Sequence, residues 1–154
     1  MEATRPIGPI ELTAITTADS ATAWRALTDP EMVAMWFTEA SGIGPVGAPY
    51  RLDFGDGSVI EGVIREVEPG HRLSYSWVWA GQEPRQETLV TWTAEPDPEG
   101  GTRITLIHSG WAEAGAGEVA RDDHTTYWEM YLDDLVTLLD AEDEPAGDRA
   151  GRGG

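Results

Sequence analysis

The sequence predicts an α+β fold, in which a curved antiparallel sheet of about six strands wraps around one long C-terminal helix. Apolar side chains recur at helical spacing over residues 122–139, which is typical of a long helix with one buried face. Six shorter segments before it alternate between apolar and polar side chains with a period of two, as strands do. Tight turns separate most of these segments and indicate antiparallel pairing.

The N-terminal part is predicted to form one strand and two short helices. Residues 10–17 alternate with a period of two and read as the first strand. An Asp-Ser pair can cap a short helix over residues 21–27. A second helix is predicted over residues 30–36, because Asp29 suits the N-cap and a proline is well tolerated at the first helical position.

Five further strands are expected before the long helix. They are residues 50–54, 58–66, 72–79, 87–94 and 102–108. Gly55-Asp56-Gly57 between the first two is a hairpin signal. On the last three strands the alternation places bulky side chains on a single face, which we expect to turn toward the helix.

The length of 154 residues suits one domain, which we place at residues 10–140. Residues 1–9 are predicted to be a flexible N-terminal arm. Residues 141–154 hold no apolar side chain larger than alanine and are predicted to be a disordered tail.

Charge and composition exclude several classes of function. The net charge of −18 disfavours nucleic acid and anionic membranes as partners. The absence of cysteine excludes disulfides, thiolate catalysis and cysteine-based zinc sites. No N-terminal apolar segment resembles a secretory signal, and no window is apolar enough to span a membrane, so a cytoplasmic location is expected.

Four motifs in order resemble one known family. They are AWRALTDP at residues 23–30 followed by Trp36-Phe37, the run of residues 62–77, GTRITLIHSG at residues 101–110, and Trp128 with its following leucines. Together they resemble the activator-of-heat-shock-ATPase homologue-like branch of the START-like (SRPBCC) superfamily, over about residues 10–139. The resemblance implies the helix-grip fold and a deep apolar cavity between sheet and helix. Where the family has a glycine before the helix tryptophan, this chain has Tyr127.

A cavity lined by aromatic side chains is therefore the first candidate site. Its expected lining residues are Trp36, Phe37, Tyr75, Trp77, Trp79, Trp92, His108, Trp111, His124, Tyr127, Trp128 and Tyr131. The plainer interpretation is that these rings simply fill the core, since each large aromatic side chain buries about 150–250 Å². Filling a core with so many indoles without leaving gaps is difficult, which favours a cavity.

His108 is the candidate catalytic residue if the protein is an enzyme. Alternation places its imidazole on the inner face, where it could act as a general base with Tyr75 or Tyr127. The alternative is a core histidine whose ring nitrogens are both hydrogen-bonded. Glu61, Glu66, Arg51 and Arg65 are alternative sources of an inward charge. Dispersed histidines make no convincing metal site, and no metal or cofactor is expected.

The leading hypothesis is a non-enzymatic binder of a small hydrophobic or aromatic molecule in this cavity. A polyketide cyclase or aromatase-like enzyme that uses His108 is the second hypothesis. The third, which the family resemblance suggests, is a chaperone-associated interaction module of the stress response. A homodimer remains open.

Overall fold

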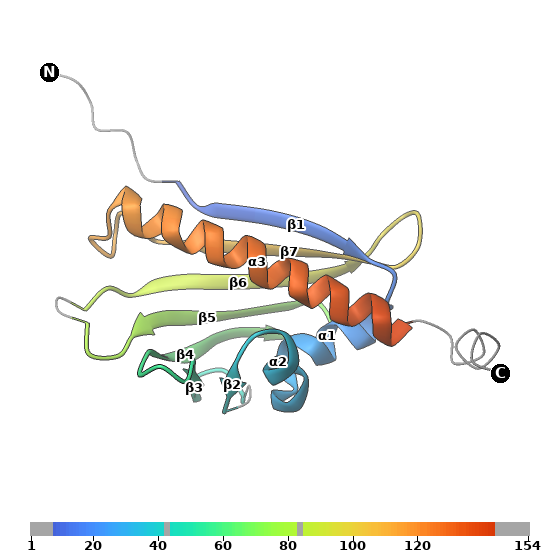
Figure 1. The fold of residues 1–154 in the computed structure, drawn as a ribbon, viewed down its shortest axis with the longest axis horizontal. Coiled ribbons are helices and arrows are strands. Elements are labelled where there is room, and N and C mark those ends of the chain that lie inside the picture. The colour runs from blue at the N-terminus through green and yellow to red at the C-terminus, as the bar shows by residue number, and fades with distance from the viewer. Residues whose placement is uncertain (1–7, 42–43, 83–84, 144–154) are drawn as a thin grey trace, which may run out of the picture.

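The computed structural model describes residues 8–143, with gaps at residues 42–43 and 83–84. Within these residues the chain forms a seven-stranded sheet and three helices (Figure 1). In chain order the elements are β1 (Ile10–Thr16), α1 (Ser20–Thr28), α2 (Pro30–Trp36), β2 (Glu39–Ala40), β3 (Pro49–Asp53), β4 (Val59–Glu68), β5 (Arg72–Trp79), β6 (Thr88–Pro96), β7 (Thr102–Ser109) and α3 (Glu118–Asp143). The predicted α+β class is confirmed.

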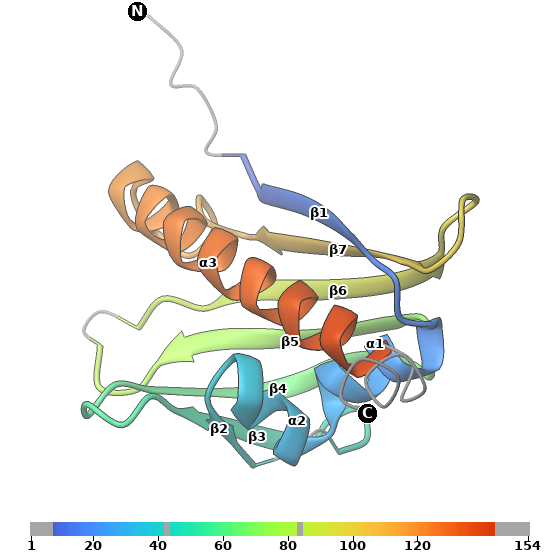
Figure 2. The same ribbon diagram turned by 45° about the vertical axis from the view of Figure 1, so that its right-hand side comes forward.

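The strands form one curled antiparallel sheet in the order β1-β7-β6-β5-β4-β3-β2. Helix α3 lies diagonally across one face of it, and α1 and α2 sit near its C-terminal end (Figures 1 and 2). The sheet has one strand more than expected. This strand, β2, has only two residues, Glu39 and Ala40, which pair with Asp53 and Leu52. Two residues are too few to show any alternation in the sequence.

The two short helices begin as their capping residues predict. The Asp19 carboxylate accepts a hydrogen bond from the Thr22 backbone N–H at 2.8 Å, and the Asp29 carboxylate accepts one from the Glu31 N–H at 3.0 Å. Each bond satisfies a donor that the helix itself leaves free. The Trp36 indole N–H of α2 then donates to a backbone carbonyl of α1, which fixes the two helices together.

Helix α3 is longer than the predicted 122–139 at both ends. At its start, residues 118–121 have no apolar stripe that would separate them from the preceding Gly- and Ala-rich loop. At its end, the helix continues into residues 141–143, which we expected in the tail. Residues 1–7 and 144–154 lie outside the described residues, and with them most of the predicted arm and tail. No helix in the described ranges is long and apolar enough to cross a membrane.

Close packing between β3, β4 and β5 depends on Gly62. A Cβ atom at Gly62 would clash with the Ser76 carbonyl oxygen and would stand 2.6 Å from the Tyr50 ring. Because glycine lies there, the Tyr50 hydroxyl can donate to the Ser76 carbonyl at 2.5 Å. A register shift follows between Ile64 and Glu66, and such bulges increase the bend of a strand.

Candidate functional site

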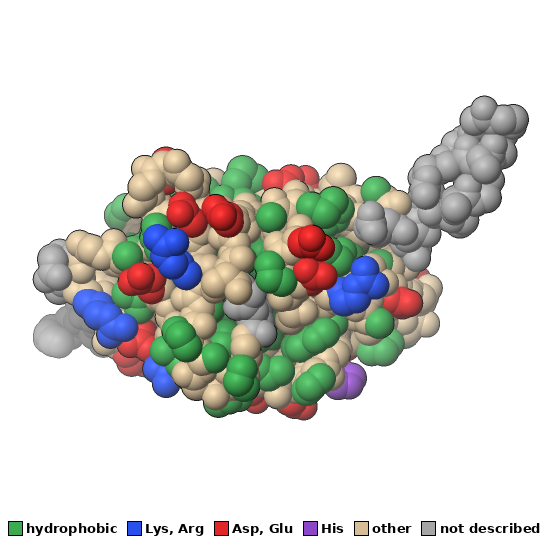
Figure 3. Space-filling view, turned by 90° about the horizontal axis from the view of Figure 1, so that it is seen from below, with side chains coloured by type: hydrophobic (Ala, Val, Ile, Leu, Met, Phe, Trp, Pro, Cys, Tyr) green, Lys and Arg blue, Asp and Glu red, His purple; other side chains and the backbone are tan. Residues whose placement is uncertain are grey.

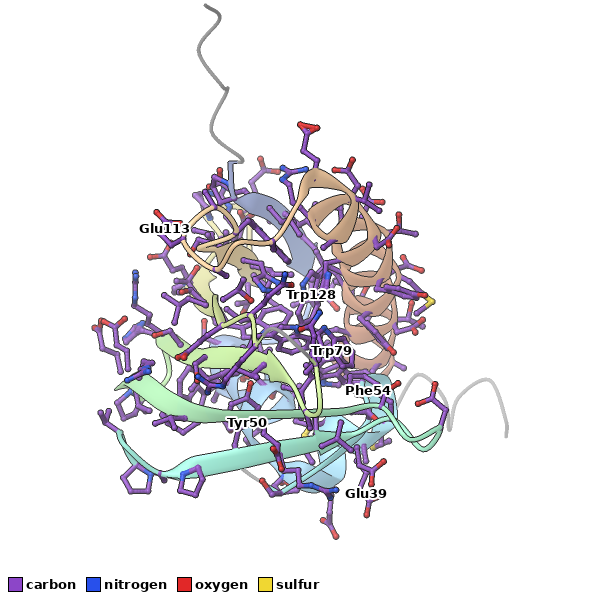
Figure 4. The ribbon with its side chains drawn as sticks, turned by 90° about the vertical axis from the view of Figure 1, so that its left-hand side faces the viewer. Glu39, Tyr50, Phe54, Trp79, Glu113 and Trp128 are labelled. Carbon is purple, nitrogen blue, oxygen red and sulfur yellow. The ribbon has the colours of Figure 1, made fainter. Side chains whose placement is uncertain are left out.

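An open pocket of about 410 Å³ lies between the N-terminal half of α3, the end of β5 and the β3–β4 turn. We call it the aromatic pocket. Its lining residues are Phe37, Phe54, Asp56, Ser58, Trp77, Trp79, Asp123, His124, Tyr127, Trp128 and Tyr131. Figure 4 shows Phe54, Trp79 and Trp128 in the space between the sheet and α3. Most of the wall is aromatic, and the few polar groups are concentrated on the β3–β4 turn and the helix.

Phe37, the residue that caps the C-terminus of α2, is the centre of the ring cluster. Its ring stacks over Trp77 with a centroid distance of 6.3 Å and meets the edge of Tyr131 at 4.8 Å. It also meets Phe54 at 5.7 Å and Trp128 at 5.4 Å. Residues from α2, β5, α3 and the β3–β4 turn are thereby held as one wall. Rings that are fixed by one another present their faces at little entropic cost on binding.

His124 connects the helix to the sheet at the inner end of the pocket. Its Nδ1 lies 2.7 Å from the Ala120 carbonyl oxygen, which can only accept, so Nδ1 carries the proton. Its Nε2 therefore accepts, from the Trp77 indole N–H at 3.3 Å and from the Trp79 indole N–H at 3.1 Å. Burial lowers the pKa of His124, although the Ala120 carbonyl and the Asp123 carboxylate oppose this effect. The neutral imidazole is thus the form that suits both indoles.

His108 lies in the interior behind His124, with ring centroids 5.4 Å apart, and is fully buried. Its Nδ1 accepts from the Trp128 indole N–H at 2.9 Å, which leaves Nε2 protonated. Nε2 lies 2.7 Å from the Thr88 hydroxyl and donates to it. Burial, with a smaller contribution from His124, holds the pKa of His108 well below its usual range. Both ring nitrogens are engaged, as in the alternative of a core histidine.

Five of the twelve expected lining residues fill the interior and do not line the aromatic pocket. They are Trp36, Tyr75, Trp92, His108 and Trp111, and each is at most 5% exposed. Trp92 meets Trp36 and Trp128 edge-on, each at 5.7 Å, and donates to the Tyr75 hydroxyl at 2.9 Å. Only about 20 Å³ of free space remains beside Trp36, Tyr75 and Trp92.

The other seven expected residues do line the aromatic pocket. They are Phe37, Trp77, Trp79, His124, Tyr127, Trp128 and Tyr131. On α3 they share one face, since positions three or four apart are neighbours on a helix surface. Tyr127, which replaces the family's glycine, is 59% exposed and stands at the rim. The space that these residues line is thus a pocket open to solvent beside α3.

Four lining residues were not predicted: Phe54, Asp56, Ser58 and Asp123. Phe54 continues the alternation of Tyr50 and Leu52, so the period of two could have indicated it. The others had no such signal, because their approach to the pocket depends on how the β3–β4 turn faces α3.

The alternative inward charges face outward or pair at the surface. Glu61 and Arg51 are exposed. Arg65 pairs with Glu87 at 2.9 Å, and Arg72 pairs with Glu66 at 2.9 Å, all with half-exposed side chains. Among residues 8–41, 44–82 and 85–141, no three histidine or acidic side chains are placed to hold a metal ion together.

Comparisons with known proteins agree with the fold. Residues 17–140 match the family described as Activator of Hsp90 ATPase homolog 1-like protein. No protein with a curated description matches the sequence. The crystal structure of DynU16, from the dynemicin biosynthetic locus, is 30% identical with a TM-score of 0.77, and the match covers 87% of this chain but only 48% of DynU16. The chain therefore spans about half the length of that relative.

Two further solved structures match over nearly their whole length. Protein MLL2253 from Mesorhizobium loti is 27% identical with a TM-score of 0.79, and the match covers 88% of this chain and 98% of that protein. The Aha1 dimer from Colwellia psychrerythraea is 23% identical with a TM-score of 0.71, over 86% of this chain and 96% of that one, which shows a shared fold alone. The family match spans most of the chain and agrees with the helix-grip architecture. The chain therefore belongs to the Activator of Hsp90 ATPase homolog 1-like family of the START-like (SRPBCC) superfamily.

Proposed function

We propose that the protein binds a small hydrophobic or aromatic molecule in the aromatic pocket, without changing it chemically. The observation that carries the proposal is the pocket itself: about 410 Å³ walled mainly by aromatic rings that contact one another. Ligand sites typically have volumes of about 300–1,000 Å³, mostly apolar walls and a few polar groups. Burial of apolar ligand surface contributes about 25 cal/mol per Å² before ordering costs, and fixed rings keep those costs low.

Catalysis by His108 is the weaker proposal. A general base needs a free nitrogen within reach of the substrate, and both nitrogens of His108 are bound to Trp128 and Thr88. Tyr75, its proposed partner, accepts from Trp92 in the packed interior. Burial raises the pKa of Tyr75, which makes its ionisation near neutral pH still harder.

A chaperone-associated interaction module has less support from the surface. Within the described part of the chain, the large exposed apolar side chains are Ile15, Met35, Val46, Val119, Tyr127 and Met130, which lie on β1, on α2, before β3 and on α3. Figure 3 shows one face of the molecule, on which hydrophobic, acidic and arginine side chains are interspersed. A docking face for a partner protein would be expected to concentrate its apolar side chains in one patch. A homodimer stays a prediction.

Filling the aromatic pocket tests the proposal without removing core contacts. Ser58 lines the pocket from the β3–β4 turn, directly before β4 begins. Ser58→Phe would place a ring in the free space. We expect naphthylmethanol, a neutral aromatic probe, to bind the native chain with saturation in calorimetric titrations. Ser58→Phe should weaken that binding at least about tenfold, because the filled volume excludes the probe.

Two pairs of variants complete this test. Ser58→Ala is the matched control at the same position and should bind as the native chain does. Trp79→Ala should weaken binding about tenfold through the loss of an aromatic wall, whereas Trp24→Ala removes an indole outside the pocket and should not. Unsaturable binding to the native chain, or equal affinities in Ser58→Phe and Ser58→Ala, would refute the proposal.

A further inference from the structure

The charged groups among the described lining residues of the aromatic pocket are both carboxylates. Asp56 enters from the β3–β4 turn and Asp123 from the first turns of α3, and both carboxylates are exposed to solvent. The described residues that line the pocket include no arginine, and the sequence has no lysine. Burial favours the neutral form of His124, and its Nε2 can accept from the two indole N–H groups only in that form. No positive group of the described lining thus offsets the two carboxylates.

The electrostatic environment of Tyr131 indicates that the Asp56 carboxylate acts on the wall of the pocket. Burial raises the pKa of Tyr131, and the charges of Asp134 and Asp56 raise it further. Asp134 and Asp56 both create a negative potential at the phenol, which disfavours its ionised form. The same potential would attract a cation placed beside that ring.

The ring faces add a second, independent attraction for positive charge. Trp79, Tyr131 and Phe54 meet at the pocket, with centroid distances of 5.6 Å between Phe54 and Trp79 and 6.4 Å between Phe54 and Tyr131. Cations bind over aromatic faces, and quaternary ammonium groups are typically held by several rings at once. An anion would instead meet both the ring faces and the carboxylates unfavourably.

We propose that the ligand of the aromatic pocket is an organic cation, with a flat apolar body among the rings and an amine or quaternary ammonium group beside Asp56 and Asp123. This inference rests on the proposed function and specifies the class of its ligand. The apolar body supplies the affinity by burial, while the two carboxylates and the ring faces select the charge. Because the carboxylates are exposed, their contribution should fall as salt increases.

Three probes with one aromatic body separate charge from burial. Naphthylmethyl-trimethylammonium is the cation, naphthylmethanol the neutral probe and naphthylacetate the anion. Calorimetric titration of the native chain should give the tightest binding for the cation, about tenfold tighter than the neutral probe, and the weakest for the anion. In the double variant Asp56→Asn/Asp123→Asn, the cation should bind only about one- to threefold more tightly than the neutral probe.

The large negative charge of the whole chain makes a matched control necessary. Glu129 lies on α3 outside the aromatic pocket, and Glu129→Gln combined with Asp122→Asn removes the same charge as the double variant. This control should keep the native ratio. An equal loss in both double variants, or equal binding of the three probes to the native chain, would overturn the inference while leaving the proposed function standing. If none of the probes binds, the proposed function fails, and the inference fails with it.

Discussion

Two histidines on neighbouring elements have opposite tautomers, and each tautomer is set by a single group. The Ala120 carbonyl fixes the proton of His124 on Nδ1, so that its Nε2 accepts from two indoles. The Trp128 indole fixes the proton of His108 on Nε2, so that it donates to Thr88. No described buried side-chain nitrogen or oxygen lacks a hydrogen-bond partner. The tryptophans are therefore donors in a polar network as well as apolar filling.

Protonation of these histidines should destabilise the fold in a defined pH window. The pKa values of His108 and His124 are lowered in the folded chain, mainly by burial, whereas unfolded histidines titrate near about 6.5. Between those values the unfolded chain binds more protons, so the free energy of unfolding should fall as pH decreases below about 6.5. The maximum slope is about 1.4 kcal/mol per pH unit for each histidine.

Urea denaturation between about pH 7.5 and 4.5 measures this slope. Asp19 and Asp56 have lowered pKa values, and their stabilisation is lost only as pH falls below the usual range of an aspartate, near about 4. The histidines thus dominate above about pH 4.5. His124→Gln should flatten the profile, while His71→Gln, at an exposed position, serves as the control. A native profile that is flat through this window would contradict the assignment.

At the scale of elements, α3 is held to the two ends of β1. Near its start, Arg121 donates to the carbonyls of Gly8 and Pro9, each at 2.9 Å. Near its end, the Asp140 carboxylate accepts from the Thr16 hydroxyl at 2.6 Å and the Thr17 N–H at 3.0 Å. These contacts set the position of the helix along the β1 side of the sheet. The aromatic pocket opens on its other side, toward β5 and the β3–β4 turn.

Removal of the contact at the C-terminal end should cost stability. Asp140→Ala deletes the acceptor for Thr16 and Thr17, and we expect the free energy of unfolding to fall by about 1 kcal/mol. A free aspartate in the last turns of a helix is unfavourable, so its replacement would otherwise be neutral or stabilising. Asp133→Ala, at an exposed position on the same helix, controls for helix propensity. Urea denaturation measures the free energy of unfolding of both variants. A larger decrease for Asp133→Ala than for Asp140→Ala would contradict the stabilising role of the Asp140 contacts.

At the scale of the whole molecule, the charge of −18 opposes compaction. Arginines form several ion pairs, such as Arg65 with Glu87 and Arg103 with Asp97. The chain has 28 acidic residues and only 10 basic ones, so most acidic residues have no arginine to pair with. The excess negative charge is spread over the surface, and self-repulsion among these groups depends on the ionic strength.

Salt should therefore stabilise the fold. Raising NaCl from about 0.01 M to about 0.5 M shortens the screening length from about 30 Å to a few Å, and we expect Tm to rise by about 3 °C or more. A variant that neutralises four exposed glutamates should start from a higher Tm and gain less from salt. The four are Glu11, Glu61, Glu95 and Glu99. Calorimetry measures Tm at each salt concentration. A decrease in Tm as salt increases would show that attraction within ion pairs outweighs repulsion among the acidic groups.

The sequence alone determined the kind and order of the main elements, because helix caps, turn glycines and side-chain periods are local signals. Asp19 and Asp29 mark their helices, and the alternation on β6 and β7 correctly places Trp92 and His108 inward. The family was also evident from motifs in order. The two-residue β2 and the true ends of α3 were missed because their residues show no period.

Only the tertiary structure decided which aromatic residues fill the interior and which line a free space. Trp77 and Trp92 have the same sequence signature, yet Trp92 packs between Trp36 and Trp128 while Trp77 reaches the aromatic pocket. That difference depends on where α3 crosses the curved sheet and on where α2 packs against α3. The approach of Asp56 to Asp123 around one pocket likewise joins residues far apart in the chain, and periodicity within a single element carries no information on such distances.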